Sequence, residues 1–337
     1  MKMMLGLDDN FKKYSNVKSV LIQGGYKKQQ PQFSIVIPTY RRISTLKVTL
    51  ESALNQDSKD YYDIIICDNN PQRNDETESF ISSVKDDRVI YYKNLENIGM
   101  VGNWNRCIEL CDGNFMIMIH DDDILSPYFI SNSKKILKRY SKIDILYPLR
   151  INWWKNKNEA KPIFLQYTKF RLYKLNVIDY LLGNSDPPTG VLLRKSAMIQ
   201  LGGYSEYAYP SSDYYFNVKA VLNINVYRCL SYFSIYRWES NTSMKQKTLE
   251  GFREKDIPLI LFILKKLHVP NFIGNVILKL YNIRSINYIK EFCPNSSQNI
   301  NDHNLPLNSH YIKIYRIIEN QIRYLIRLKN RLWSISI

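Results

Sequence analysis

The sequence predicts an α/β protein with a mostly parallel sheet flanked by helices, followed by a helical C-terminal region. Short apolar runs alternate with helical patterns from residue 33 to residue 119, polar clusters follow three of those runs, and the chain becomes basic and helical from about residue 245. Hydrophobic residues make up 45% of the 337 residues, as in a folded globular protein. We expect an N-terminal extension over residues 1–32, a sheet domain over 33–244 and a basic helical region over 245–337.

Four short apolar runs, three of them rich in β-branched residues, carry the first half of the predicted sheet, at residues 33–37, 64–67, 88–92 and 115–119. Helical spacing fills the segments between them, over residues 42–55, 75–84 and 103–110. Such an alternation favours right-handed crossovers and parallel strands, whose ligands bind beyond the carboxyl ends of the strands. The residues after these strands should therefore share one edge of the sheet.

Four consecutive polar residues, His120-Asp121-Asp122-Asp123, follow the strand at residues 115–119. Adjacent carboxylates repel one another, which raises their pKa values and costs stability unless a cation lies among them. Carboxylate oxygens are the ligands that Mg²⁺ and Mn²⁺ prefer, and Mg²⁺ commonly shares its shell with a substrate phosphate. The cluster predicts a site for one of these metals; a solvated acidic turn is the alternative.

The second half of the sheet domain has a less regular pattern. A strand is expected at residues 143–147, a loop at 186–190 leads into the apolar segment 191–194, and residues 201–204 form a tight turn. Ser211-Ser212-Asp213 precedes an apolar-periodic helix at residues 214–222. The pattern by itself favours Asp213 as a helix cap.

The net charge of +16 favours an anionic partner, such as nucleic acid, a membrane surface or a phosphorylated substrate. From residue 241 onward the chain holds 15 basic against 6 acidic residues, so the excess is concentrated at its C-terminal end. Residues 311–333 combine apolar residues at helical spacing with basic residues, which is typical of a helix lying on a membrane. A helix docked on its own domain is the alternative. We find no secretory signal and no apolar stretch approaching the ~20 residues of a spanning helix.

An ordered set of motifs resembles family-2 glycosyltransferases of the GT-A fold, of the type that builds bacterial surface polysaccharides. It consists of residues 35–40, Asp68, Asn97-Ile98-Gly99, Asn105, the acidic cluster, residues 202–204, Asp213, Tyr236-Arg237 and residues 241–243. The resemblance covers about residues 33–243. It implies an inverting, metal-dependent enzyme that uses a nucleotide-sugar donor.

The resemblance also implies roles for individual residues. Donor-binding positions are Pro38, Thr39, Tyr40, Asp68, Asn97, Gly99, Asn105, Asp121 near the ribose and Arg237 near the leaving diphosphate. Asp122 matches the principal metal ligand with Asp123 beside it, and Asp213 matches the general base. From the residues alone, Asp68 could instead cap a turn, Arg237 could be a surface charge and His120 a polar residue at a strand end.

Four positions depart from the family pattern. His120 and Cys67 stand where acidic residues are common, Trp104 replaces a frequent arginine, and Ser212 stands where a glutamate often precedes the base. These departures bear on which nucleotide and sugar are bound more than on the type of reaction.

The function expected from the sequence is sugar transfer to a glycan acceptor, linked to a polyprenyl diphosphate, in a pathway such as O-antigen synthesis. The enzyme would work in the cytoplasm, bound peripherally at the inner face of the cell membrane through its basic helices. A nucleotidyl or phosphoryl transferase and a nucleic-acid-binding protein are the alternatives. The chain lacks a P-loop motif and a nucleic-acid-binding signature, so we expect no nucleic-acid partner.

Overall fold

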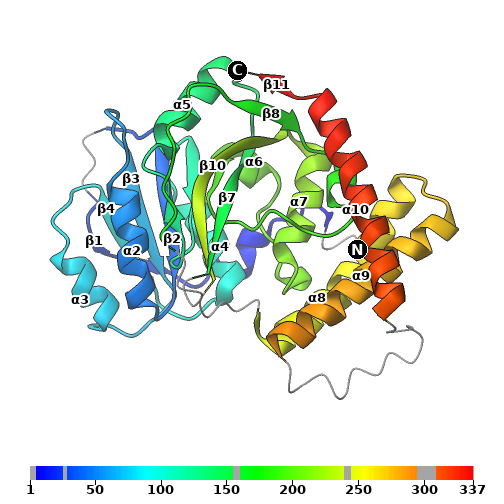
Figure 1. The fold of residues 1–337 in the computed structure, drawn as a ribbon. Coiled ribbons are helices and arrows are strands. Elements are labelled where there is room, and N and C mark those ends of the chain that lie inside the picture. Colours follow the sequence, from blue (N-terminus) through cyan, green and yellow to red (C-terminus); the bar gives the residue numbers. More distant parts are fainter. Residues whose placement is uncertain (1–4, 26–28, 155–159, 239–243, 294–308, 337) are drawn as a thin grey trace.

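The predicted strands form the parallel part of a mixed sheet (Figure 1). The computed structural model of the chain describes residues 5–25, 29–154, 160–238, 244–293 and 309–336, the side chains of residues 309–316 excepted. Parallel pairing joins four strands in the order β4-β3-β2-β5, with bounds Val89–Asn94, Asp63–Asp68, Phe33–Thr39 and Phe115–Met118. The predicted α/β class and the expected strands are thereby confirmed.

Antiparallel pairing extends the sheet on both sides. Beyond β5 the order is β9 (Val191–Arg194), β7 (Ile145–Trp154), β10 (Val226–Trp238), β8 (Arg171–Lys174) and β11 (Ile335–Ser336). Within this part, β7 and β10 are parallel to each other. β6 (Ile124–Leu125) directly follows the acidic cluster and pairs with β10, which ties the cluster to the second half of the sheet. The opposite edge is β1 (Ser19–Gln23), so part of the N-terminal segment joins the sheet.

Helices cover both faces of the sheet because successive residues of a strand point to opposite sides. Ile35 and Ile37 of β2 pack with one helical layer, and Val36 packs with the other. The first layer is α2 (Ile43–Leu54), α3 (Glu76–Ser83) and α5 (Phe129–Arg139). The second contains α4 (Gly99–Leu110), α6 (Lys195–Gln200) and α7 (Ser212–Asn223). Short 3₁₀ helices lie at η1 (Asn10–Tyr14), η3 (Val177–Tyr180) and η4 (Glu206–Ala208).

The C-terminal region packs against the sheet domain (Figure 1). Its helices are α8 (Gln246–Lys266), α9 (Asn271–Phe292) and α10 (Ser309–Leu332). Leu259, Ile260 and Ile263 of α8 are buried in the same core as α4 and α7. α9 lies against α8, and α10 runs from α9 back to β8, where β11 extends the sheet. Within the described ranges, none of the helices has the length and apolarity needed to cross a bilayer.

Helix α10 has a docked face and an exposed face. On the docked face Ile322 packs against the core, and Asn330 is buried and donates a hydrogen bond to Asp179 Oδ1 at 2.7 Å. Apolar side chains of the exposed face are Ile317, Tyr324, Leu325, Leu328 and Leu332, followed by Trp333. Docking therefore accounts for one face of the helix. Leu325, expected on the apolar stripe, is exposed, and the side chains of Lys313, Ile314 and Arg316 lie outside the description.

Candidate active site

A cavity of about 450 Å³ opens at the carboxyl ends of β2 and β5. Its walls include Pro38, Thr39 and Tyr40 after β2, and Asp121 and Asp122 after β5. Arg42 also follows β2, His120 also follows β5, and Asn69 comes directly after β3. More distant segments contribute Asn97, Gly99, Asn103, Trp104, Pro187, Asp213, Tyr236 and Phe252. The structure thus brings together residues from three of the strand ends expected at this edge of the sheet.

Asp121 and Asp122 lie beside an arginine that the sequence analysis does not single out. Thr39 Oγ1 donates a hydrogen bond to Asp121 Oδ2 at 2.7 Å, while Arg42 Nη1 lies 2.8 Å from Asp122 Oδ2 and 3.4 Å from Asp121 Oδ1. Burial raises the pKa of Asp121 to about 7. All three carboxylate residues of the cluster are buried, so a solvated acidic turn does not describe it.

Asp123 lies beneath the cavity and joins two distant segments. Its Oδ2 accepts a hydrogen bond from Thr189 Oγ1 at 2.6 Å, and its Oδ1 accepts one from the backbone N–H of Arg237 at 3.0 Å. Burial raises the pKa of Asp123 to about 8. The buried Arg237 side chain donates to the backbone carbonyls of Asp122 and Thr45. Arg237 is therefore no exposed surface charge; it supports the backbone of the acidic cluster and lies off the cavity wall.

His120, Asp122 and Asp123 offer potential ligand atoms that all lie within 4.8 Å of one another. These residues fit a divalent cation. His120 Nε2 is buried without a hydrogen-bond partner, and burial lowers the pKa of the imidazole to about 4, which keeps it neutral near pH 7. Carboxylates and a neutral imidazole are ligands that Mn²⁺ accepts. His120 thus joins the two predicted ligands as a third candidate.

His120 is held in place by Trp104, and both residues depart from the family pattern. Their rings stack with centroids 5.5 Å apart and an interplanar angle of 12°. Trp104 also meets the ring of Tyr204 edge-on at 5.4 Å. The backbone N–H of His120 donates to Thr189 Oγ1 at 3.1 Å. The stack thus orients the imidazole ring, and the hydrogen bond fixes the backbone of His120 beside the acidic cluster.

Asp213 lies in the first turn of α7, on the wall of the same cavity. Its Oδ1 accepts a hydrogen bond from the backbone N–H of Tyr214 at 2.8 Å, and its Oδ2 accepts one from Asn184 Nδ2 at 2.8 Å. Burial raises the pKa of Asp213 to about 7. The N-cap position of α7 belongs to Ser211, so capping does not explain Asp213. A carboxylate with a pKa near neutrality suits a general base.

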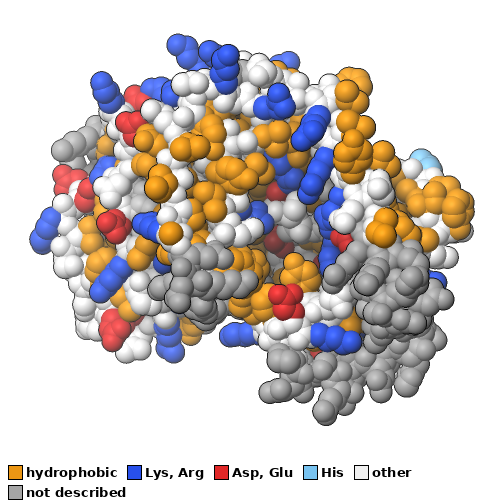
Figure 2. All heavy atoms as spheres, viewed as in Figure 1, with side chains coloured by type: hydrophobic (Ala, Val, Ile, Leu, Met, Phe, Trp, Pro, Cys, Tyr) orange, Lys and Arg blue, Asp and Glu red, His pale blue; other side chains and the backbone are white. Residues whose placement is uncertain are grey.

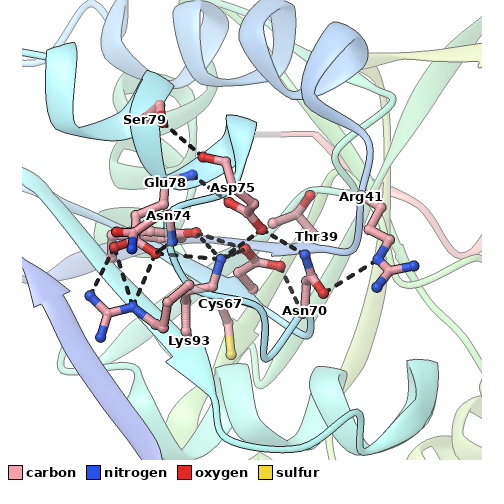
Figure 3. A network of polar contacts seen from close by, with 12 residues as sticks. Thr39, Arg41, Cys67, Asn70, Asn74, Asp75, Glu78, Ser79 and Lys93 are labelled. Atoms are coloured by element: carbon pink, nitrogen blue, oxygen red, sulfur yellow. Dashed lines mark hydrogen bonds and ion pairs between the residues drawn. The ribbon is translucent and has the colours of Figure 1, made fainter.

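Asp68 lies at the end of β3 and is not on the cavity wall, but it takes part in the polar network of Asn70, Asp75 and Lys93 that Figure 3 shows. It accepts hydrogen bonds from Tyr91 Oη at 2.7 Å and from the backbone N–H of Asn70 at 2.9 Å, which is the turn-capping geometry of the alternative interpretation. The fully buried Lys93 Nζ lies 3.1 Å from Asp68 and 2.8 Å from Asp75. Asp68 and Lys93 therefore fix the loop after β3.

The predicted asparagines occupy different places. Asn97 and Gly99 line the cavity, and Asn69 Nδ2 donates to Asn97 Oδ1 at 2.7 Å and to the Gly99 carbonyl at 3.1 Å. Asn105 lies off the cavity, where its side chain pairs with both backbone groups of Tyr204 at 2.8 and 2.9 Å. It joins α4 to the segment after α6. The motif residues 241–243 lie outside the described residues.

Sequence reasoning misses several residues of this site. Arg42 lies close behind the strand-end residues Pro38, Thr39 and Tyr40. Two adjacent arginines after a predicted strand end are a sequence feature that could have indicated a site for an anionic ligand. Asn69 stands next to Asp68 at an expected strand end, and the sequence places it at this edge of the sheet without assigning it a role in the site. Asn184 comes from the irregular second half, where no local pattern marks it. Tyr236 belongs to the Tyr236-Arg237 motif, but the resemblance assigns a role to Arg237 alone. The long-range pairings of these residues depend on the tertiary fold.

Several curated proteins are similar to this chain. A glycosyltransferase of Methanocaldococcus jannaschii described as uncharacterized is 27% identical over 58% of this chain and 66% of its own length. A GalNAc(5)-diNAcBac-PP-undecaprenol β-1,3-glucosyltransferase of Campylobacter jejuni is 35% identical over 28% of this chain and 31% of its own. A UDP-Glc:α-D-GlcNAc-diphosphoundecaprenol β-1,3-glucosyltransferase of Escherichia coli is 35% identical over 29% and 38%. The matched part is thus less than two thirds of each relative.

Solved structures share the fold. TarS of S. aureus, residues 1–349 in complex with UDP-GlcNAc, has a TM-score of 0.54 and 16% identity, covering 79% of this chain and 74% of its own. The mannosyltransferase PcManGT of Pyrobaculum calidifontis, in complex with GDP-Man and Mn²⁺, has a TM-score of 0.51 and 13% identity over 91% and 88%. These likenesses confirm the GT-A architecture expected from the motifs.

The family assignment follows from the sequence and agrees with the fold. Residues 34–202 match the family described as Glycosyl transferase family 2. This segment contains β2 to β5, the acidic cluster and both residues of the Trp104–His120 stack. It makes up half of the chain. With its strand-end cavity and buried acidic cluster, the chain belongs to glycosyl transferase family 2.

Proposed function

We propose that the protein is a metal-dependent, inverting glycosyltransferase that moves a sugar from a nucleotide-sugar donor to a glycan acceptor. One observation carries this proposal: the acidic Asp121–Asp122 pair and the near-neutral carboxylate of Asp213 lie on the walls of one cavity. Sugar transfer requires a group that stabilises the negative charge on the leaving group and a base that removes the proton of the acceptor hydroxyl. The acidic pair and Asp213 would supply these two functions in one cavity. Family membership favours sugar transfer over the phosphoryl-transfer and nucleic-acid-binding alternatives.

The donor would bind with its nucleoside against the end of β2. Pro38, Thr39 and Tyr40 form that wall, and Asp121 lies beside Thr39 for contact with the ribose. Asp122, Asp123 and His120 would hold Mn²⁺ or Mg²⁺, which when bound neutralises charge on the diphosphate. Arg42 is the arginine on the cavity wall and can contact the same diphosphate, while Arg237 holds the cluster from beneath.

Asp213 would act as the base. As the acceptor oxygen attacks the anomeric carbon, its proton passes to Asp213, and the bond between that carbon and the diphosphate oxygen breaks. The nucleoside diphosphate leaves with the bonding electrons. A single displacement of this kind inverts the anomeric centre. Asn184 and the backbone of Tyr214 orient the carboxylate through its two oxygens.

The acceptor is proposed to be a glycan on a polyprenyl diphosphate, used in surface-polysaccharide synthesis of the O-antigen type. The names of two relatives describe transfer to undecaprenol-linked sugars. The exposed face of α10 carries Tyr324, Leu325, Leu328 and Trp333, and basic residues are interspersed along the helix. Such a face suits peripheral binding at the anionic inner surface of the cell membrane, on the cytoplasmic side.

Donor hydrolysis by the purified full-length protein tests this function. A panel of UDP-, GDP- and dTDP-sugars is assayed with and without Mn²⁺, for the wild type, Asp122→Ala and the exposed control Asp57→Ala. We expect Mn²⁺-dependent hydrolysis of one donor, lost in Asp122→Ala and retained in Asp57→Ala. Failure of the folded protein to bind any donor in the presence of Mn²⁺ would exclude the proposal.

A further inference from the structure

A second cavity, of about 370 Å³, lies between the sheet domain and the C-terminal helices. It is lined by Arg150 of β7 and Tyr236 of β10, by Asp256 of α8 and by Arg284 of α9. In Figure 2 the surface is hollowed between these two parts of the molecule, with blue basic side chains along the side formed by the C-terminal helices. This cavity has no role in the donor site described above.

The two cavities meet at the proposed base. Asp213, Pro187, Tyr236 and Phe252 lie on the walls of both. The donor cavity also reaches Asp121 and Asp122, whereas the second cavity reaches Asp213 without them. For an attack on the anomeric carbon from the face opposite the leaving diphosphate, the acceptor hydroxyl must approach from the side of Asp213 away from the metal ligands. The second cavity offers such an approach, because it reaches Asp213 but not Asp121 or Asp122.

Most charged groups around the second cavity are already satisfied within the protein. Asp186 pairs with Arg228 and also accepts a hydrogen bond from Tyr180 Oη at 2.9 Å. Asp256 accepts a hydrogen bond from Tyr281 Oη at 2.7 Å. Arg284 lies 3.1 Å from Glu319 of α10. Because these charged groups are already paired within the protein, they shape the cavity but contribute little to the binding of a charged ligand.

Arg150 is the exception among the charged residues that the structure describes on these walls. Its Nη1 donates to the Ser185 carbonyl at 2.9 Å, and its guanidinium lies over the ring of Tyr236 at 5.6 Å. No carboxylate of the described chain lies within ion-pair distance, and its buried Nε has no hydrogen-bond partner. A partly buried cation without a counter-charge costs stability unless an anion binds there. Arginine suits phosphate in particular, because its planar donors match the phosphate oxygens.

Next to Arg150 the cavity wall is aromatic. Trp238 and Phe292 both line the cavity, and their rings are stacked with centroids 6.2 Å apart and an interplanar angle of 4°. Tyr288 continues this wall, with its ring centroid 5.8 Å from that of Phe292. Flat aromatic faces bind the apolar faces of sugars and hydrocarbon chains. The cavity thus combines a base, an unpaired cation and an apolar wall.

We propose that the second cavity is the acceptor site and that Arg150 binds a phosphate group of an alkyl- or prenyl-linked diphosphate acceptor. This inference rests on the proposed function, since it assumes that Asp213 receives the proton of the acceptor hydroxyl. It assigns α8 and α9 a direct part in substrate binding. It also makes recognition of the acceptor depend on an anion rather than on sugar contacts alone.

Binding of defined probes to the full-length protein tests the assignment. Undecyl diphosphate, the uncharged undecyl β-D-glucoside and inorganic pyrophosphate are titrated by calorimetry in metal-free buffer, which keeps the diphosphates from binding through a metal at the acidic cluster. The variants are Arg150→Gln, the charge-retaining Arg150→Lys, and Arg139→Gln as a matched loss of an exposed arginine on α5.

We expect undecyl diphosphate to bind more tightly than the glucoside and pyrophosphate. Arg150→Gln should weaken undecyl diphosphate binding about tenfold or more, the loss typical of a charged hydrogen bond. Arg150→Lys should retain part of the affinity, and Arg139→Gln all of it. Equal losses for the glucoside, unchanged affinity in Arg150→Gln, or equally tight binding of pyrophosphate would overturn the assignment. Donor hydrolysis in the same variants reports on the proposed function separately, because the donor cavity does not include Arg150.

Discussion

At the scale of single residues, the site is built from side chains whose partners lie far away in the sequence. Thr39 holds Asp121, Thr189 holds Asp123, and Asn184 holds Asp213. The Trp104–His120 stack shows how two departures from the family pattern fit together, because each provides the other with an aromatic contact. A substitution at one of these positions should therefore act through its partner.

Replacing Asp213 by Asn tests the proposed base. The amide keeps the size of the side chain but cannot take up a proton, so sugar transfer should fall at least about a hundredfold, the lower range for general base catalysis. Donor binding, measured by calorimetry, should stay close to that of the wild type because the donor contacts remain. Full transfer activity in Asp213→Asn would remove Asp213 from the mechanism.

The pH dependence of transfer tests the environment of Asp213. Because burial raises the pKa of this carboxylate to about 7, the base is protonated at lower pH, and kcat/KM at saturating Mn²⁺ should rise with pH through about 7. The hydrogen bond from Asn184 favours the ionised form. Asn184→Ala should therefore move the midpoint of this limb to higher pH. A midpoint that stays in place, or moves to lower pH, would contradict this account.

At the scale of elements, the loops after the strands are rigid because buried ion pairs and side-chain hydrogen bonds hold them. Lys93 of β4 is buried against Asp68 of β3 and Asp75 at the start of α3 (Figure 3). Asn70 continues this network by donating to Asp75 Oδ2 at 2.6 Å and accepting from Arg41 Nε at 3.3 Å. The loop after β3, which contains Asn70, is thereby held in place beside the donor cavity.

Lys93→Met should be strongly destabilising. It leaves buried carboxylates without their cation, which costs about 3–5 kcal/mol in the free energy of unfolding. The loss should be larger at pH 8 than at pH 5, because protonation of the carboxylates relieves the unpaired charge. Urea denaturation at both pH values measures this.

Lys134→Met is the matched control for Lys93→Met. It removes the exposed pair of Lys134 with Asp60, and exposed pairs contribute at most about 1 kcal/mol. Similar losses of unfolding free energy in the two variants would show that the buried network does not stabilise the fold.

At the scale of the whole molecule, the C-terminal helices complete the protein in two ways. α8 joins the central core, and α10 returns along α9 to the sheet, where β11 pairs with β8. The docking of α10 leaves its other face, with Tyr324 and Leu325, exposed, as is Trp333 directly after the helix. One helix can therefore pack on its own domain and still present a surface to a membrane.

Vesicle binding tests the exposed face of α10. Arg327 and Arg331 are exposed there, and each basic residue near an anionic membrane contributes about 1 kcal/mol. The double variant Arg327→Gln/Arg331→Gln should bind vesicles of phosphatidylglycerol and phosphatidylcholine about thirtyfold more weakly in sedimentation assays. Lys138→Gln/Arg139→Gln on α5 removes the same charge elsewhere and should have little effect. Equal weakening by both double variants would argue against a dedicated membrane face.

The first half of the sheet and the acidic cluster can be predicted from the amino-acid sequence, because they depend on local patterns. Apolar runs such as residues 33–37 and 64–67 form strands wherever they are buried, and polar residues at their ends must lie at one edge. Helix α4 begins at Gly99, earlier than the pattern indicated, since Gly99 and Gly102 weaken a helical pattern. The strand character of residues 226–233 was not visible in the pattern.

Which of the polar residues line the donor cavity depends on the folded structure and cannot be predicted from local patterns. Asp68 and Asn105 lie off the donor cavity because Lys93 and the backbone of Tyr204 satisfy them, while Arg42 and Asn184 lie on or beside its wall. Among the described residues no carboxylate lies at ion-pair distance from Arg150, whereas Arg228 pairs with Asp186. Hydrogen-bond and ion-pair partners are chosen by proximity in space, and residues far apart along the chain become neighbours only when the sheet and the C-terminal helices have packed.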